Sequence, residues 1–269
     1  METVPPFDLD AYAARSGGLD FSEIAWDDVA GSPVPPAAVR TLRYMQDIEA
    51  HTIVYLRALL ATRAIDEPEI AVFLARWLYE ETGHGLALGR FLAAAGHPVA
   101  PRAHGREPFS QRIEGALTSM VSRAWRDFCA VHMTWGAINE LTALTAYRRL
   151  AALARHPVLD VLLDRIARDE ARHFLFYYRQ AAQRLARPAV ARVARLLVDR
   201  FWAPVGSGVQ PREETLFMAR YLFGGSAGQQ AARQVDEPIR RLPGFSGAGL
   251  LEGWIDRFAV GGMGDRGEC

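Results

Sequence analysis

The feature that most constrains this chain is a pair of Glu-x-x-His segments, which lie about ninety residues apart in the 269-residue sequence. Glu81 and His84 form the first pair, and Glu170 and His173 form the second. Side chains three residues apart on a helix lie on one face about a turn apart, so each pair can bind a cation through a carboxylate and an imidazole. A single pair occurs often by chance. Two pairs, each on an apolar helical stripe, indicate a common site.

Two further helical segments each offer one carboxylate on an apolar face. Glu49 shares its stripe with Met45 and Leu56, and Glu140 lies near Gly136 and Leu144. Four unrelated charges at helix edges would be the simplest alternative. That interpretation is disfavoured, because an unpaired carboxylate that faces a core costs several kcal/mol. The order Glu, Glu-x-x-His, Glu, Glu-x-x-His supplies enough ligands for two metal ions with open coordination positions, as in carboxylate-bridged bundles.

The apolar periodicity predicts helices throughout the chain and almost no strands. Four long helices are expected at about 36–63, 66–95, 111–155 and 157–186, with shorter ones at 188–202, 211–223, 226–240 and 248–258. Asp66 is the expected N-cap of the second helix, and residues 96–112 are expected to form a long crossover. We therefore predict an all-α, ferritin-like four-helix bundle with a di-metal centre, extended by additional C-terminal helices.

The expected organisation is one domain with two irregular ends. Residues 1–35, rich in Pro, Gly and Asp, are predicted to form an irregular N-terminal arm. Residues 36–258 are predicted to form a single di-iron domain with its C-terminal helical extension, and residues 259–269 a disordered tail.

Composition excludes several classes of function. The 31 basic residues balance 31 acidic ones, so no basic excess points to nucleic acid. No apolar run approaches the roughly eighteen residues of a membrane span. The N-terminus lacks a signal region, so cytoplasmic residence is expected. Cys129 and Cys269 offer neither a disulfide framework nor a C-x-x-C iron centre.

Two motifs carry a resemblance to a known family. The Glu-Glu-x-x-His-Gly run at 80–85 and the Asp-Glu-x-Arg-His run at 169–173 resemble the soluble acyl-(acyl-carrier-protein) desaturases, which are ferritin-like di-iron enzymes. The segment 236–244 also resembles bacterial members, and the likeness extends over roughly residues 40–250.

The resemblance implies a division of the candidate ligands between two metals. One iron would be bound by Glu49, Glu81 and His84, and the other by Glu140, Glu170 and His173, with Glu81 and Glu170 bridging. Asp169 matches a family aspartate that orients a metal-bound histidine.

The resemblance also implies an activity and its partners. The chain would be an O₂-dependent di-iron oxidase that acts on a fatty acyl chain, foremost a desaturase of chains bound to acyl carrier protein or held as another acyl thioester. It would use two Fe ions, with Mn as an alternative metal, O₂ as co-substrate and a ferredoxin-type electron donor. A homodimer is implied as well.

Two departures from the family pattern leave the reaction open. Ala143 stands where the family often has a Thr that is thought to assist O₂ activation, and Gly83 stands where the family has an Arg. Hydroxylation or N-oxygenation by a di-iron oxygenase of specialised metabolism is therefore an alternative. Iron handling by a ferroxidase is a second alternative, although storage bundles are usually shorter and lack the extra C-terminal helices. Small residues such as Gly85 and Gly136 either leave room for an acyl chain or permit close helix packing.

Overall fold

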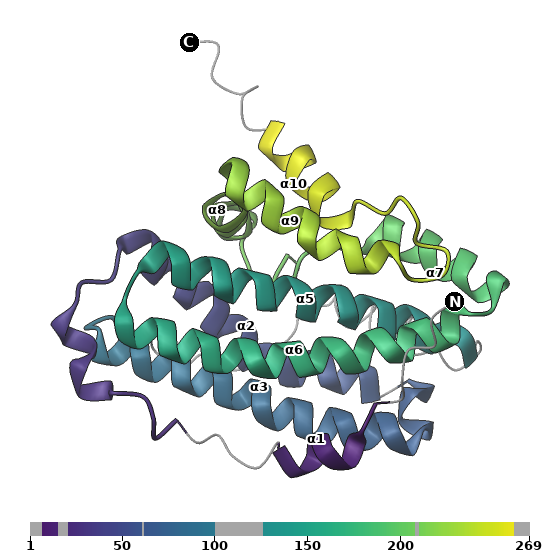
Figure 1. The fold of residues 1–269 in the computed structure, drawn as a ribbon, viewed down its shortest axis with the longest axis horizontal. Helices are drawn as coiled ribbons and strands as arrows, with labels where there is room; N and C mark the ends of the chain where they lie inside the picture. Colours follow the sequence, from purple (N-terminus) through teal and green to yellow (C-terminus); the bar gives the residue numbers. More distant parts are fainter. Residues whose placement is uncertain (1–6, 16–20, 61, 100–125, 208–209, 261–269) are drawn as a thin grey trace.

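Four long helices form the body of the molecule and run side by side (Figure 1). The structure, a computed structural model, describes residues 7–15, 21–60, 62–99, 126–207 and 210–260. The helices of the bundle are α2 (Pro36–Leu60), α3 (Pro68–Ala94), α5 (Cys129–Ala154) and α6 (Pro157–Leu185). The described residues contain no strand. The predicted all-α, ferritin-like bundle is confirmed.

Proline and local hydrogen bonds fix where these helices begin. Pro36, Pro68 and Pro157 each open a helix of the bundle at its first position, where the missing N–H is not needed. His156 caps α6, because its Nδ1 accepts a hydrogen bond from Leu159 N over 3.2 Å. Together with the left-handed Arg155 (φ 51°), this cap turns the chain sharply from α5 into α6.

Glycine lets the bundle helices approach closely at two points. A Cβ on Gly85 would lie 3.2 Å from the Cβ of Glu49, so α2 and α3 nearly touch there. A Cβ on Gly136 would overlap the ring of Tyr177, which lies against the backbone of α5. At these two positions the small residues serve close helix packing.

The C-terminal helices cover α5. α7 (Pro188–Phe201), α8 (Arg212–Phe223) and α9 (Gly225–Arg240) each contact α5, and α10 (Leu250–Val260) packs on α8 and α9 (Figure 1). Their bounds differ from the predicted ones by only a few residues. This layer is the C-terminal extension that the sequence predicts.

The N-terminal region is more ordered than expected. α1 (Leu9–Arg15) and the 3₁₀ turn η1 (Trp26–Gly31) both pack on α3, and Tyr12, Ile24 and Val29 are buried. The prediction of an irregular arm is therefore wrong for α1, which is a helix, whereas η1 is a single short turn. In Figure 1, α1 lies on the α3 side of the bundle, opposite the C-terminal layer.

The start of the third helix and the cap of the second differ from the sequence-based expectations. The third helix begins at Cys129, after a short 3₁₀ turn, η3 (Arg126–Phe128), and residues 100–125 of the predicted helix and crossover lie outside the described residues. Residues 261–269 of the predicted tail also lie outside the described residues. Asp66 does not cap α3: it ends a 3₁₀ turn, η2 (Arg63–Asp66), and Glu67 is the N-cap residue.

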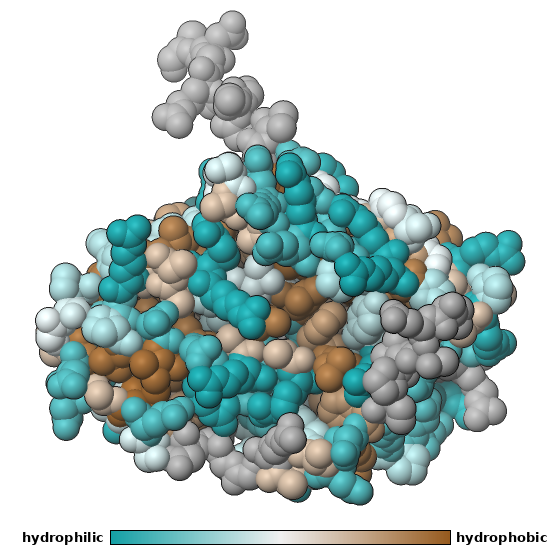
Figure 2. Space-filling view, in the orientation of Figure 1, coloured by the Kyte–Doolittle hydropathy of each residue, from teal (hydrophilic) through white to brown (hydrophobic). Residues whose placement is uncertain are grey.

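No helix in the described part of the chain is long and apolar enough to cross a membrane. Figure 2 shows hydrophilic side chains interrupting the apolar surface on the face drawn in Figure 1.

Candidate metal centre

The four bundle helices bring all six predicted ligands to one place inside the protein. α2 contributes one carboxylate, α3 a Glu-x-x-His pair, α5 one carboxylate and α6 the second pair. Each side chain belongs to a residue that is at most 6% exposed. We call these residues the six-residue cluster; its members are Glu49, Glu81, His84, Glu140, Glu170 and His173.

The cluster consists of two overlapping groups of four. One group contains Glu49 and His84, the other contains Glu140 and His173, and both contain Glu81 and Glu170. Within each group, one ligand atom from every residue lies within 4.8 Å of the others. Two carboxylates shared between two cation-sized groups are the arrangement that a carboxylate-bridged metal pair requires.

The hydrogen bonding of the cluster is incomplete, and a cation would complete it. Within the described chain, five of its buried atoms have no hydrogen-bond partner, and these are Glu49 Oε2, Glu81 Oε1, His84 Nδ1, Glu170 Oε1 and His173 Nδ1. Buried polar atoms without partners are costly. Carboxylate and imidazole are common ligands of iron, manganese and zinc. The donor set therefore fits a di-metal site.

Protons compensate the excess negative charge when no metal is bound. Burial and the charge of Glu170 raise the pKa of Glu81 to about 7, and burial raises that of Glu140 to about 8. Burial opposes protonation of His84, but the hydrogen bond with Asp169 and the nearby Glu170 carboxylate, whose Oε1 lies 3.3 Å from Nδ1, outweigh it and raise the pKa to about 9. Metal ions would displace these protons, so binding and protonation compete.

Two outer carboxylates orient the two histidines. His84 Nε2 donates to Asp169 Oδ2 over 3.2 Å, and His173 Nε2 donates to Glu80 Oε2 over 2.7 Å. Both imidazoles therefore turn Nδ1 toward the cluster. Asp169 therefore contacts a histidine of the cluster, and its role toward a bound metal stays a prediction.

Glu80 is not among the predicted site residues. The signal was present: Glu80 precedes Glu81 as Asp169 precedes Glu170, and each outer carboxylate binds the histidine of the other helix. Burial alone would raise the pKa of Glu80, but its contact with the His173 imidazole outweighs burial and lowers the pKa to about 2.

A second residue outside the prediction is Tyr147, whose hydroxyl donates to Glu49 Oε1. Tyr147 lies on α5, two turns after Glu140, and is fully buried. Its partner is on α2, so no spacing within one helix could have indicated this contact.

Comparison with known proteins places the chain in a family. The sequence profile of the fatty acid desaturase family matches residues 54–207, which is more than half of the chain. This chain belongs to the fatty acid desaturase family. The match includes five members of the six-residue cluster and begins after Glu49. Membership supports an oxidoreductase, and the buried carboxylates and histidines fit the di-metal site such an enzyme needs.

A solved structure has the same fold as this desaturase-family chain. It is the X-ray structure of DesA2 from Mycobacterium tuberculosis H37Rv, a candidate acyl-ACP desaturase. The two chains share 22% identity with a TM-score of 0.55, and the alignment covers 93% of this chain and 95% of that one. No curated protein sequence matches this chain.

Three other histidines of this desaturase-family chain lie outside the six-residue cluster. His51 Nδ1 donates to Asp47 O over 2.6 Å, and His156 Nε2 donates to Val29 O over 3.0 Å. Burial lowers the pKa of His132 to about 4, so that ring stays neutral at pH 7. None of the three belongs to either metal-sized group.

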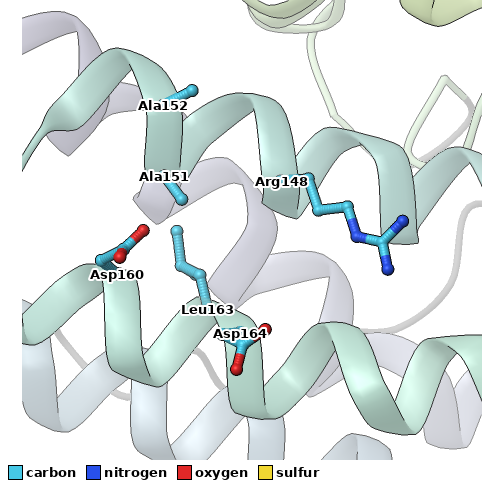
Figure 3. Close-up of a pocket in the computed structure, with 6 residues that line it drawn as sticks. All are labelled: Arg148, Ala151, Ala152, Asp160, Leu163 and Asp164. Carbon is cyan, nitrogen blue, oxygen red and sulfur yellow. The ribbon is translucent and has the colours of Figure 1, made fainter.

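A hollow of about 220 Å³ lies between α5 and α6 (Figure 3). α5 provides Arg148, Ala151 and Ala152 to its lining, and α6 provides Asp160, Leu163 and Asp164. No member of the six-residue cluster contributes to this lining, so the hollow is no part of the candidate centre.

Proposed function

We propose that this protein is an O₂-dependent di-iron desaturase that acts on a fatty acyl chain carried by acyl carrier protein. The observation that carries the proposal is the pair of overlapping groups that share Glu81 and Glu170. Family membership supplies the reaction class. The name of the structural neighbour supports the carrier-bound substrate.

In this proposal the six-residue cluster holds the two iron ions. Glu49 and His84 would bind one ion and Glu140 and His173 the other, with Glu81 and Glu170 shared between the two groups. When bound, the metal pair supplies O₂ activation for removal of hydrogen from an unactivated C–H bond. Desaturation takes two hydrogen atoms from the acyl chain and reduces one O₂ to two waters. The balance therefore needs two further electrons and two protons, with the electrons supplied by a ferredoxin-type donor.

The protein's own residues orient the ligands and exclude water. Asp169 and Glu80 fix the ring planes of the two histidines, and Tyr147 fixes Glu49. Phe73, Trp77 and Leu88 are buried around the same helices and keep the interior apolar. A homodimer, as the resemblance implies, completes the proposal.

The test begins with anaerobic loading of the protein with Fe²⁺ and counts iron per chain. The loaded protein then receives O₂, ferredoxin with its reductase, and a panel of acyl-carrier thioesters, and mass spectrometry follows the acyl group. We expect two irons per chain and a loss of two mass units. A chain that binds no metal pair would overturn the proposal.

Hydroxylation is the second candidate function, and it is supported by the side chains at positions 142 and 143. Ala143 lacks the hydroxyl that the family often has at this position, and Thr142 does not replace it, because its hydroxyl donates to Ile138 O over 2.7 Å. A gain of sixteen mass units in the same experiment would select this function. Two bound irons without an acyl product would direct the search to amine substrates.

A further inference from the structure

The N-terminal helix reaches the surroundings of the candidate metal centre through one side chain. Tyr12, on α1, is 3% exposed, and its hydroxyl donates to Glu80 Oε2 over 2.7 Å. The ring of Tyr12 packs on Phe7 and Phe73, with centroids 5.6 and 5.4 Å away. Packing alone would be satisfied by a phenylalanine. The hydroxyl therefore needs a separate explanation.

The same carboxylate oxygen binds His173. Glu80 Oε2 accepts one hydrogen bond from Tyr12 and one from His173 Nε2, each 2.7 Å long. The other oxygen, Oε1, contacts Arg172 Nη2 over 3.2 Å. Tyr12 and Arg172 thus hold Glu80 from two sides, and Glu80 sets the ring orientation of His173.

The corresponding carboxylate of the other half is held differently. Asp169 orients His84 and also contacts Arg172. Its third partner is Arg165 Nη1, 2.6 Å from Oδ1 and one turn away on the same helix, α6. One half of the cluster is therefore supported within the bundle, and the other half depends on a residue from the N-terminal arm.

We propose that Tyr12 is a positioning residue for the metal bound by the His173 group, so that its hydrogen bond to Glu80 sets the affinity of one of the two metal positions and leaves the other unchanged. The inference rests on the proposed ligand assignment. Partners outside the ligand set typically change metal affinity by about 10–100-fold when they are removed. Without the Tyr12 hydroxyl, Arg172 alone holds Glu80 from outside the cluster, so Glu80 fixes the ring of His173 less firmly.

The experiment measures Tyr12→Phe in two backgrounds that each leave one group of four complete. Glu49→Gln leaves the Glu140/His173 group intact, and Glu140→Gln leaves the Glu49/His84 group intact. Binding of Co²⁺ is followed by calorimetry and by the visible absorption of the bound ion. We expect Tyr12→Phe to weaken Co²⁺ binding by about 10–100-fold in the Glu49→Gln background and to change its spectrum. In the Glu140→Gln background, affinity and spectrum should not change.

Two control variants separate the hydrogen bond from packing. Arg165→Met should show the opposite pattern, with weaker binding only where the Glu49/His84 group is complete. Phe7→Leu disturbs the packing of the arm but keeps the hydroxyl, and should leave both affinities unchanged. A loss with Phe7→Leu as large as that with Tyr12→Phe would overturn the role of the hydroxyl.

The outcomes distinguish this inference from the proposed function. Equal losses in both backgrounds, or no loss in either, would overturn the inference while the metal centre stands. Failure of the unaltered protein to bind two Co²⁺ ions would overturn the metal centre, and the inference with it.

Discussion

Each histidine of the six-residue cluster has a fixed orientation because its two ring nitrogens have different partners. Nε2 of both rings donates to an outer carboxylate, and Nδ1 of both faces the cluster with no hydrogen-bond partner among the described residues. The outer carboxylates are joined through Arg172, which contacts both Glu80 and Asp169. The two halves of the site therefore share one cation outside the cluster as well as two carboxylates within it.

Removal of a shared carboxylate should cost more metal than removal of an unshared one. Glu170 belongs to both groups of four, whereas Glu49 belongs to one. We expect Glu170→Ala to lose both metal ions and Glu49→Gln to lose one, counted by elemental analysis after anaerobic loading. Helix content should change little, because the bundle core remains. Glu237→Ala, at an exposed position of α9, is the control and should keep both ions. Two ions retained in Glu170→Ala would refute the ligand assignment.

Gly136 is predicted to tolerate no side chain. A Cβ there would overlap three ring atoms of Tyr177, and both residues lie in packed helices. Gly136→Ala should lower the free energy of unfolding by about 1–3 kcal/mol, as overpacked cores do. Gly89→Ala is the matched control, since its nearest neighbours are 3.9 Å away on Gln46 and Ala favours a helix by up to about 1 kcal/mol. Denaturant unfolding would measure the free energy of unfolding of both variants. Equal values for Gly136→Ala and Gly89→Ala would contradict the packing argument.

The site residues that the sequence predicts are those that belong to a repeated helical pattern. The six cluster residues stand out because Glu and Glu-x-x-His occur twice, each time on an apolar face. Glu80 was accessible to the same logic through its place before Glu81. Tyr12 and Tyr147 were not, because each contacts a carboxylate of a distant segment and neither belongs to a repeated pattern.

At the scale of elements, helices with strong local signals were predicted well. Proline opens α6 and α7 as expected, and left-handed glycines such as Gly96 and Gly244 fall just beyond helices. The assignment of Asp66 as a cap failed because a 3₁₀ turn intervenes, which Thr62 caps by accepting a hydrogen bond from Ala64 N.

α1 was missed for a different reason. A helix of seven residues has little intrinsic stability, and α1 depends on tertiary packing. Phe7 and Tyr12 lie against Phe73, and Phe7 also contacts Phe176, so the segment is ordered by aromatic contacts with α3 and α6. Such contacts cannot be read from local periodicity.

The C-terminal layer is predicted to depend on one buried carboxylate. Asp236, on α9, is fully buried and accepts hydrogen bonds from Leu251 N and Glu252 N at the start of α10, both 3.0 Å long. Asp236→Ala leaves these donors without their partner and should cost about 1–3 kcal/mol. Asp256→Ala, at an exposed position of α10, should cost little. Thermal unfolding would compare the two variants. Similar melting temperatures for Asp236→Ala and Asp256→Ala would mean that α10 is held by apolar contacts alone.

For the molecule as a whole, the balanced charge of 31 basic and 31 acidic residues conceals a strongly acidic interior. Four carboxylates and two histidines meet between the bundle helices, with α1 on one side and the C-terminal helices on the other (Figure 1). Packing on both sides holds these charges in place, and either metal ions or protons must neutralise them. The stability of the protein should therefore depend on pH and on metal together.

The metal-free protein should lose stability as pH rises from about 5 to about 9. In the folded state the pKa of Glu81 rises from 4.5 to about 7, that of Glu140 from 4.5 to about 8, and that of His84 from 6.5 to about 9. Over these intervals the folded state binds more protons than the unfolded state, so the free energy of unfolding falls with rising pH. The lowered pKa values of Glu170 and His132 act in the opposite direction, that of Glu170 only below its ordinary value of 4.5 and that of His132 only below 6.5. Between about pH 5 and pH 6.5 the two raised carboxyls, Glu81 and Glu140, outweigh the single histidine.

Bound metal should reverse this dependence, because it requires the deprotonated ligands and replaces the protons that stabilise the metal-free state. The gap in melting temperature between metal-loaded and metal-free protein should therefore widen from about pH 5 to about pH 9. Circular dichroism at a series of pH values, with and without Mn²⁺ as a redox-stable ion, would measure it. Glu49→Gln, which keeps one group of four, should show a smaller gap. A metal-free melting temperature that rises over this range would mean that the buried carboxyls are already ionised, and that charges other than bound protons balance the cluster.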